Sequence, residues 1–117
     1  MVQEVRVGLY ARVSTEEQAQ RYGIGAQIER LREYAQGRSY AIVEEFIDEG
    51  WSGGNLERPA LTRLREAIAQ GRVDVVLAYD PDRLARDLAD LLFLDKEFQR
   101  AGVRLETVTT EIDSSPE

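Results

Sequence analysis

The sequence predicts an α/β fold, a three-layer sandwich with a mostly parallel central sheet of four or five strands and helices on both faces. Strand-like apolar runs alternate along the chain with segments of helical spacing, an order typical of parallel strands joined by helices. The run over residues 73–79 is almost continuously apolar, as in a central strand that is covered on both faces. With 117 residues, the chain has the length of one domain.

Apolar residues at i, i+4, i+7 and i+11 from Ile24 indicate a helix that ends before Gly37, a favoured helix stop. Another helix is expected to begin at Pro59, because proline is favoured at the first helical position. Residues 15–25 are polar and are expected to form a loop. The expected elements are strands over residues 5–10, 40–47, 73–79 and 103–108, and helices over residues 24–36, from residue 59, and over residues 85–101.

The expected third helix carries more apolar residues than one sheet-facing stripe needs. Leu92 and Phe93 lie outside that stripe. Burial under a neighbouring loop, an interface, and a following element each account for them, and the sequence leaves these open. The residues of the stripe itself are Leu88, Leu91, Leu94 and Phe98.

Composition excludes several kinds of site. The chain has no cysteine and no histidine, which removes disulfides, thiolate and imidazole metal sites, and the Ser-His-Asp triad. A net charge of −7 argues against a free-standing basic DNA-binding domain but leaves a local phosphate site possible. No apolar run approaches a membrane span and no signal peptide is found, so a cytoplasmic location is expected.

Arg12 and Ser14 follow the first expected strand at its carboxyl end, where open α/β sheets bind ligands. Side chains two residues apart in extended chain point the same way, so a hydroxyl would lie beside a fixed positive charge. One interpretation is a nucleophile beside a phosphate clamp. The other is that Ser14 caps the next helix and Arg12 is a solvated charge.

Three more arginines belong to the same predicted edge of the sheet. Arg58 closes the long glycine-rich loop, and Arg83 and Arg86 follow the third strand at a spacing that would place them on one helical face. Arginine stays protonated and binds phosphate through a planar fork. Together with a serine hydroxyl, such a cluster suits phosphoryl transfer.

These motifs resemble the catalytic domain of the serine site-specific recombinases, the resolvase/invertase enzymes and the large serine integrases. The resemblance covers nearly the whole chain. The matching stretches are Tyr10-Ala-Arg12-Val-Ser14-Thr15-Glu-Glu-Gln18, Gln27, Asp48-Glu-Gly-Trp-Ser52-Gly, Arg58-Pro59 and Asp82-Arg83-Leu84-Ala-Arg86. It implies a resolvase-like fold and a DNA-recombining activity.

The resemblance further implies that Ser14 attacks a DNA phosphodiester and forms a 5′-phosphoserine link with a free 3′-hydroxyl, without metal or nucleotide cofactor. Arg12, Arg83 and Arg86 would line the phosphate, and Arg58, Asp82 and Gln27 would support them. Tyr10, Gln18, Asp48 and Ser52 match the remaining motif positions as supporting residues. The base that deprotonates Ser14 stays open between Asp82, a hydroxyl pKa lowered by arginine, and water.

In such a family the partners are double-stranded DNA recombination sites and a homodimer that assembles into a tetramer, with no membrane association. The chain is expected to be a catalytic domain over residues 1–117 that stops before the long dimerisation helix and the DNA-binding region. The stretch between Ser14 and Gln27 resembles the integrase or transposase branch, with Gly23 and Gly25 as departures that affect a local helix cap.

Three other functions remain as alternatives. A phosphoacceptor receiver domain would need an acidic pair after the first strand and a lysine after the last, and the sequence has neither there. A metal-dependent nuclease would use Asp48, Glu49, Asp80 and Asp82, although four arginines among them oppose a cation. A non-catalytic DNA-binding or assembly module predicts that Ser14→Ala leaves function intact.

Overall fold

The computed structural model describes residues 3–18 and 23–109. Its strands form one all-parallel sheet in the order β2-β1-β3-β4. The strands are β1 (Arg6–Val13), β2 (Ala41–Glu49), β3 (Val75–Ala78) and β4 (Arg104–Thr107), and the helices are α1 (Thr15–Gln18), α2 (Ile24–Gly37), α3 (Pro59–Ala69), α4 (Pro81–Leu84) and α5 (Leu88–Arg100).

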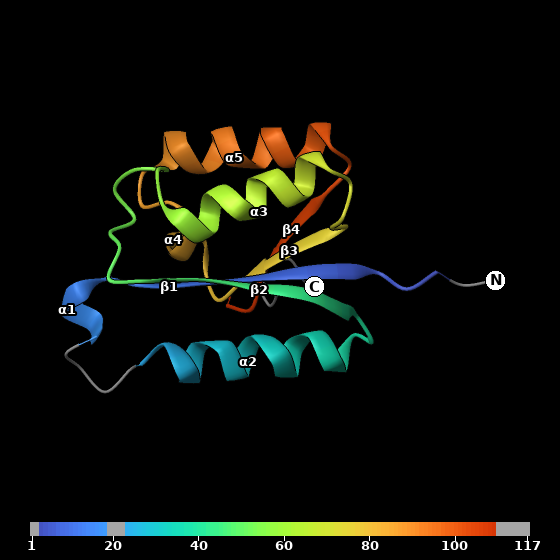
Figure 1. The fold of residues 1–117 in the computed structure, drawn as a ribbon, viewed down its shortest axis with the longest axis horizontal. Coiled ribbons are helices and arrows are strands. Elements are labelled where there is room, and N and C mark those ends of the chain that lie inside the picture. Colours follow the sequence, from blue (N-terminus) through green and yellow to red (C-terminus); the bar gives the residue numbers. More distant parts are fainter. Residues whose placement is uncertain (1–2, 19–22, 110–117) are drawn as a thin grey trace, which may run out of the picture.

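The sheet is covered on both faces, as the sequence predicts. Helix α2 lies against one face, whereas α3 and α5 lie side by side over the other (Figure 1). Strand β1 supplies both cores, because Val7 and Leu9 pack towards α2 while Tyr10 packs towards α3, the alternation expected of an extended chain. The predicted three-layer α/β architecture is therefore confirmed.

Two local predictions differ from the structure at the carboxyl edge of the sheet. Residues 15–18 form the short helix α1 rather than a loop, because Ser14 and Glu17 make reciprocal capping hydrogen bonds. The predicted third helix over residues 85–101 begins only at Leu88, as α5, because Ala85 has extended backbone angles and ends the separate short helix α4 before it. Arg83 and Arg86 consequently do not share one helical turn.

Helix α5 also faces differently from its predicted stripe. Leu94 and Phe98 are fully buried, whereas Leu88 is 67% exposed at the start of the helix. Leu92 and Phe93 are 54% and 53% exposed, so the apolar surface that the sequence indicates outside the stripe is present in the described structure.

Strand β1 is longer than predicted and continues through Val13. Its partner β2 accompanies it to the end, with Arg12 opposite Asp48, but pairing with β3 stops at Tyr10. The last residues of β1 therefore lack a neighbouring strand on one side. Helices α1 and α4 lie near this end of the sheet (Figure 1). No helix in the described residues is long and apolar enough to span a bilayer.

Candidate active site

Arg12 is a buried residue of β1, with only 2% of its surface exposed. Its guanidinium donates to three main-chain carbonyls: Nε to Arg83 at 3.0 Å, Nη1 to Trp51 at 2.9 Å and Nη2 to Asp82 at 2.9 Å. Arg12 therefore joins the loop after β2 to the segment after β3. Burial lowers the pKa of Arg12, and the nearby charges of Arg58 and Arg83 lower it further.

Gln27 of α2 completes the unpaired edge of β1. Its Oε1 accepts from the Arg12 main-chain N–H at 3.0 Å, and its Nε2 donates to the Arg12 carbonyl at 3.2 Å. The amide thus substitutes for the missing strand on the β3 side. Because buried main-chain groups need partners, Gln27 fixes the point where β1 ends and Ser14 begins.

Arg58, Tyr10 and Asp48 form a buried network beneath this edge. Arg58 Nη1 donates to the Tyr10 hydroxyl at 2.9 Å, and the hydroxyl donates to Asp48 Oδ2 at 2.6 Å. Arg58 Nη1 also donates to the Arg83 carbonyl, and Nη2 to the Leu84 carbonyl. Burial of the hydroxyl is the main reason why the pKa of Tyr10 is raised. The network holds the α4 main chain against β1.

Ser14 is half-buried and lies directly after β1. Its Oγ accepts from the Glu17 N–H at 3.2 Å, and its own N–H donates to Glu17 Oε1 at 2.8 Å. This arrangement is a capping box, so the helix-cap interpretation of Ser14 describes its hydrogen bonds in this structure. The same position also places the hydroxyl at the ligand-binding edge of the sheet, and the two interpretations are compatible.

Arg83 connects Ser14 to the segment after β3. Its Nη1 and Nη2 donate to the two carboxylate oxygens of Glu17, both at 3.0 Å, and Nη1 also donates to the Arg12 carbonyl at 2.9 Å. The Glu17 carboxylate is therefore shared between the guanidinium and the Ser14 N–H. Hydrogen bonding from Arg83 lowers the pKa of Glu17 to about 2.

Two acidic residues accompany Arg83. The Asp80 carboxylate lies 3.7 Å from Arg83 Nε, and these two buried atoms have no hydrogen-bond partner among the described residues. Asp82 is half-exposed, with its carboxylate 3.8 Å from Arg83 Nη2 and 3.9 Å from Arg12 Nη2. Asp82 thus lies between two of the predicted phosphate ligands.

The other predicted site residues lie around this centre. Arg86 is exposed, and its main-chain N–H donates to the Gly53 carbonyl at 3.2 Å. Ser52 is exposed and accepts from the Gly54 N–H at 3.0 Å, a local turn contact. Gln18 ends α1, and its side chain falls outside the described part of the structure.

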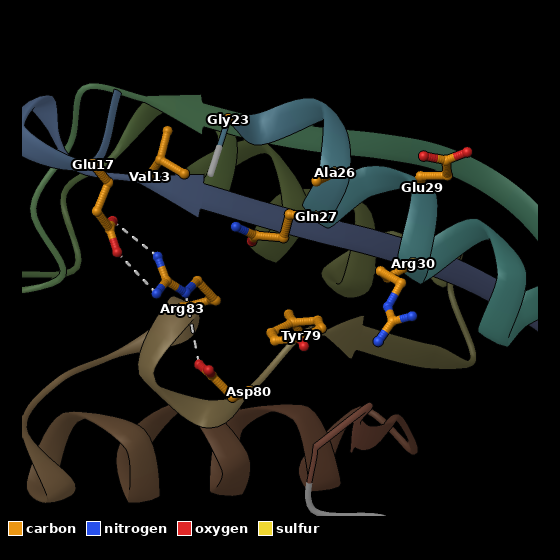
Figure 2. Close-up of a pocket in the computed structure, with 10 residues that line it drawn as sticks. All are labelled: Val13, Glu17, Gly23, Ala26, Gln27, Glu29, Arg30, Tyr79, Asp80 and Arg83. Atoms are coloured by element: carbon orange, nitrogen blue, oxygen red, sulfur yellow. Dashed lines mark hydrogen bonds and ion pairs between the residues drawn. The ribbon is translucent and has the colours of Figure 1, made fainter. Parts of the chain in front are cut away.

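A cavity of about 540 Å³ opens beside the Glu17–Arg83 pair. Figure 2 shows Gln27, Tyr79 and Arg83 at its wall, with Arg30 on α2 farther along. Asp80 lies next to Arg83 on the same wall. The cavity therefore gives solvent molecules and ions access to the residues next to Ser14.

The described carboxylates do not gather into a metal site. Within residues 3–18 and 23–109, no group of three or more Asp or Glu side chains is placed to hold an ion. Asp48, one ligand of the nuclease alternative, is committed instead to α3, where its oxygens accept from the Ala60 and Leu61 N–H groups at 2.8 and 3.1 Å.

Two residues of the site were not singled out from the sequence. Glu17 has a readable signal, because Ser14-Thr-Glu-Glu17 is a capping-box pattern, but nothing local shows that it also binds Arg83. Gly53 is buried, and a Cβ added there would lie 2.8 Å from Arg12 Nη2. That close approach depends on loop packing, which the sequence does not reveal.

Comparison with known proteins identifies relatives over nearly the full chain. A Bacillus subtilis (strain 168) protein named "Putative DNA recombinase" is 44% identical over 112 residues, which cover 95% of this chain and 22% of that protein. The Escherichia coli transposon Tn3 resolvase is 36% identical over 110 residues, covering 94% of this chain and 54% of the resolvase. This chain thus spans about a fifth to a half of these two relatives.

Solved structures agree with this relationship. The N-terminal catalytic domain of TP901-1 integrase superposes with a TM-score of 0.81 at 36% identity, covering 89% of this chain and 77% of that one. The family model for the N-terminal domain of resolvase matches residues 7–117. That match begins in β1 and includes the residues from Tyr10 to Arg86 described above. The chain belongs to the resolvase N-terminal domain family.

Proposed function

We propose that this chain is the catalytic domain of a serine site-specific recombinase, which cleaves and rejoins DNA strands. The parts that dimerise and read DNA would then lie outside these 117 residues. Family membership and the similarity to an integrase catalytic domain support this proposal. So does the length of the relatives, of which this chain spans only part.

In the proposed reaction, Ser14 Oγ attacks the phosphorus of a DNA phosphodiester. As the Oγ–P bond forms, Ser14 gives up its hydroxyl proton to Asp82 or to water; the bond from phosphorus to the 3′ oxygen breaks, and that oxygen takes up a proton to become a free 3′-hydroxyl. The resulting 5′-phosphoserine ester retains the energy of the phosphodiester, so the reverse attack by a 3′-hydroxyl rejoins the strand without an energy source. No metal or nucleotide takes part.

One observation carries this proposal: Ser14 and Arg83 bind the same carboxylate oxygen of Glu17. The Ser14 N–H lies 2.8 Å and Arg83 Nη1 lies 3.0 Å from that oxygen. An anionic oxygen is thus held beside Ser14 by an amide and a guanidinium, the kind of donors that stabilise a phosphoryl group. A phosphate oxygen at this point would lie next to the serine hydroxyl.

The arginines are proposed to have two kinds of role. Arg83 and Arg86 are proposed as direct phosphate ligands: Arg83 would exchange its contact with Glu17 for the phosphate, and the Arg86 side chain is exposed. Arg12 is proposed to line the phosphate from beneath while it fixes three main-chain carbonyls. Arg58, Asp82 and Gln27 support these groups.

The test uses the full-length protein and its own recombination site with a nick that traps the cleaved strand. We expect a covalent protein–DNA adduct that persists in EDTA and is absent from Ser14→Ala. The control is Thr15→Ala, which removes the neighbouring hydroxyl and should leave the adduct intact. An adduct that survives Ser14→Ala, or cleavage with no adduct, would refute the proposal.

A further inference from the structure

The carboxylate of Glu17 occupies the place where an anion would bind. It accepts hydrogen bonds from both terminal nitrogens of Arg83 at 3.0 Å and from the Ser14 N–H at 2.8 Å. A bidentate contact of this geometry is the one that guanidinium also makes with phosphate. A single guanidinium edge cannot serve two anions, so the same donors are unavailable to a phosphodiester while Glu17 is bound.

Arg83 would keep its place without Glu17. Its Nη1 also donates to the Arg12 carbonyl at 2.9 Å, and its Nε lies 3.7 Å from Asp80. Its main-chain carbonyl accepts from Arg12 and from Arg58. Loss of the Glu17 contact therefore leaves an oriented guanidinium with free N–H donors rather than a displaced side chain.

The surroundings of the pair are accessible and repel anions. Glu17 and Arg83 both line the 540 Å³ cavity of Figure 2. Among the described lining residues, the carboxylates of Glu17, Glu29 and Asp80 outnumber the guanidiniums of Arg30 and Arg83. Neutralising Glu17 balances these charges and at the same time releases Arg83.

We propose that Glu17 is a positioning residue that acts as an internal substitute for phosphate, holding Arg83 and the Ser14 N–H in the DNA-free chain until a phosphodiester takes its place. The inference rests on the proposed function, since it concerns the same anion site. It predicts that Glu17 competes with tetrahedral oxyanions. Hydrogen bonding from Arg83 keeps the pKa of Glu17 at about 2, so mild acid does not remove the competition.

The test is titration of the 117-residue chain with inorganic sulfate, whose charge is constant between pH 5 and 8, followed through the Ser14 main-chain N–H signal by NMR. Glu17→Gln keeps an oxygen that accepts from the Ser14 N–H but removes the charge. We expect Glu17→Gln to bind sulfate about three- to fivefold more tightly than the parent chain. The parent affinity should not increase on lowering the pH from 8 to 5.

Glu29→Gln is the matched control. It removes the same charge from the same cavity wall, but Glu29 makes no hydrogen bond or ion pair with Arg83. Its sulfate affinity should rise less than that of Glu17→Gln. The double variant Glu17→Gln/Arg83→Lys should lose the gain, because lysine lacks the bidentate fork. A cooperative melting transition well above the titration temperature would show that each variant is folded.

Equal sulfate affinity in the parent chain and Glu17→Gln would overturn the inference, as would equal gains in Glu17→Gln and Glu29→Gln. The outcome is separate from the test of the proposed function. If Glu17→Gln binds sulfate more tightly but no Ser14-dependent DNA adduct forms, the anion site is supported and the proposed recombinase function is refuted. If the adduct forms but Glu17→Gln shows no gain in sulfate affinity, the recombinase function is supported and the proposed role of Glu17 as a substitute for phosphate is refuted.

Discussion

Gly53 shows how closely the candidate site is packed around Arg12. A Cβ at this position would lie 2.8 Å from Arg12 Nη2 and 3.2 Å from Arg86 Cδ. Arg12 cannot move aside freely, because its guanidinium already donates to three main-chain carbonyls. Only glycine therefore fits at residue 53 while Arg12 holds this position.

Gly53→Ala should lower the free energy of unfolding by about 1–3 kcal/mol, as overpacking at a buried position does. It should also reduce adduct formation by the full-length protein. Urea denaturation measures the first effect. The control is Gly54→Ala, whose added Cβ would meet only the end of the Ser52 side chain at 3.2 Å. If the two variants were equally stable, the claim that residue 53 packs closely against Arg12 would be contradicted.

Glu17 should make stability depend on pH in a defined range. Hydrogen bonding from Arg83 lowers the pKa of Glu17 from 4.5 to about 2. Because the folded-state pKa is depressed, the stabilisation is fully present above pH 4.5 and is lost as the pH falls towards 2. The stability difference between the parent chain and Glu17→Gln should therefore shrink between pH 4.5 and 2.

Urea denaturation across that range checks this expectation. The comparison variant is Glu16→Gln, which removes the neighbouring carboxylate of the exposed face of α1. Its stability difference from the parent chain should vary much less with pH. A Glu17→Gln difference that is constant from pH 6 to 2 would contradict the ion pair with Arg83.

At the scale of elements, Asp48 links the end of β2 to the start of α3. Its carboxylate accepts from the Ala60 and Leu61 N–H groups and from the Tyr10 hydroxyl. The carboxylate thus satisfies first-turn donors that have no partner within the helix, although the nine-residue loop of residues 50–58 lies between β2 and α3. This contact connects the long loop to the sheet.

Asp48→Ala should cost about 2–4 kcal/mol of unfolding free energy, because it removes a helix cap and leaves the buried hydroxyl and N–H groups without an acceptor. Asp48→Asn keeps one oxygen acceptor and should cost less. Chemical denaturation of both variants gives the comparison. An Asp48→Ala variant as stable as Asp48→Asn would mean that the buried acceptor contributes little.

The sequence predicts the layers and the order of elements because hydrophobic periodicity determines them. It fails where a few residues decide between local conformations. The extended backbone at Ala85 separates Arg83 from Arg86, yet the helical spacing around it is uninterrupted. Likewise, the capping box from Ser14 to Glu17 converts a polar stretch into α1.

The site could be predicted only in part from the sequence. Arg12 and Ser14 lie at the end of β1 and Arg83 follows β3, and the parallel sheet brings these segments to one edge. Their contacts depend on three-dimensional packing: Arg12 donates to carbonyls of the loop after β2 and of α4, and Gln27 of α2 completes β1. No spacing along the chain encodes those partners.

At the scale of the whole molecule, the negative net charge predicts that this domain binds DNA weakly even if it carries the catalytic residues. The chain has a net charge of −7, whereas non-specific DNA binding depends on lysine and arginine contacts to many phosphates. The arginines of the site are also largely engaged with carboxylates and carbonyls of the chain itself. We therefore expect the proposed phosphate site, rather than a broad basic surface, to be the part of this domain that contacts DNA.

The 117-residue chain alone should bind duplex DNA at physiological salt with a dissociation constant weaker than about 10⁻⁴ M, the weak end of the usual non-specific range. Fluorescence anisotropy with a labelled duplex measures this affinity. The full-length protein serves as the positive control. Micromolar binding by the chain alone would show that a further DNA-binding surface exists on this domain.

The most direct test of the central claim is to locate the DNA attachment by mass spectrometry. The trapped adduct of the full-length protein is digested with nuclease and trypsin, and the tryptic peptide 13–21, which contains Ser14 and Thr15, is fragmented. We predict a 5′-phosphonucleotide on the Ser14 oxygen. A nucleotide attached to Thr15 or to any other residue would contradict the assignment of Ser14 as the nucleophile.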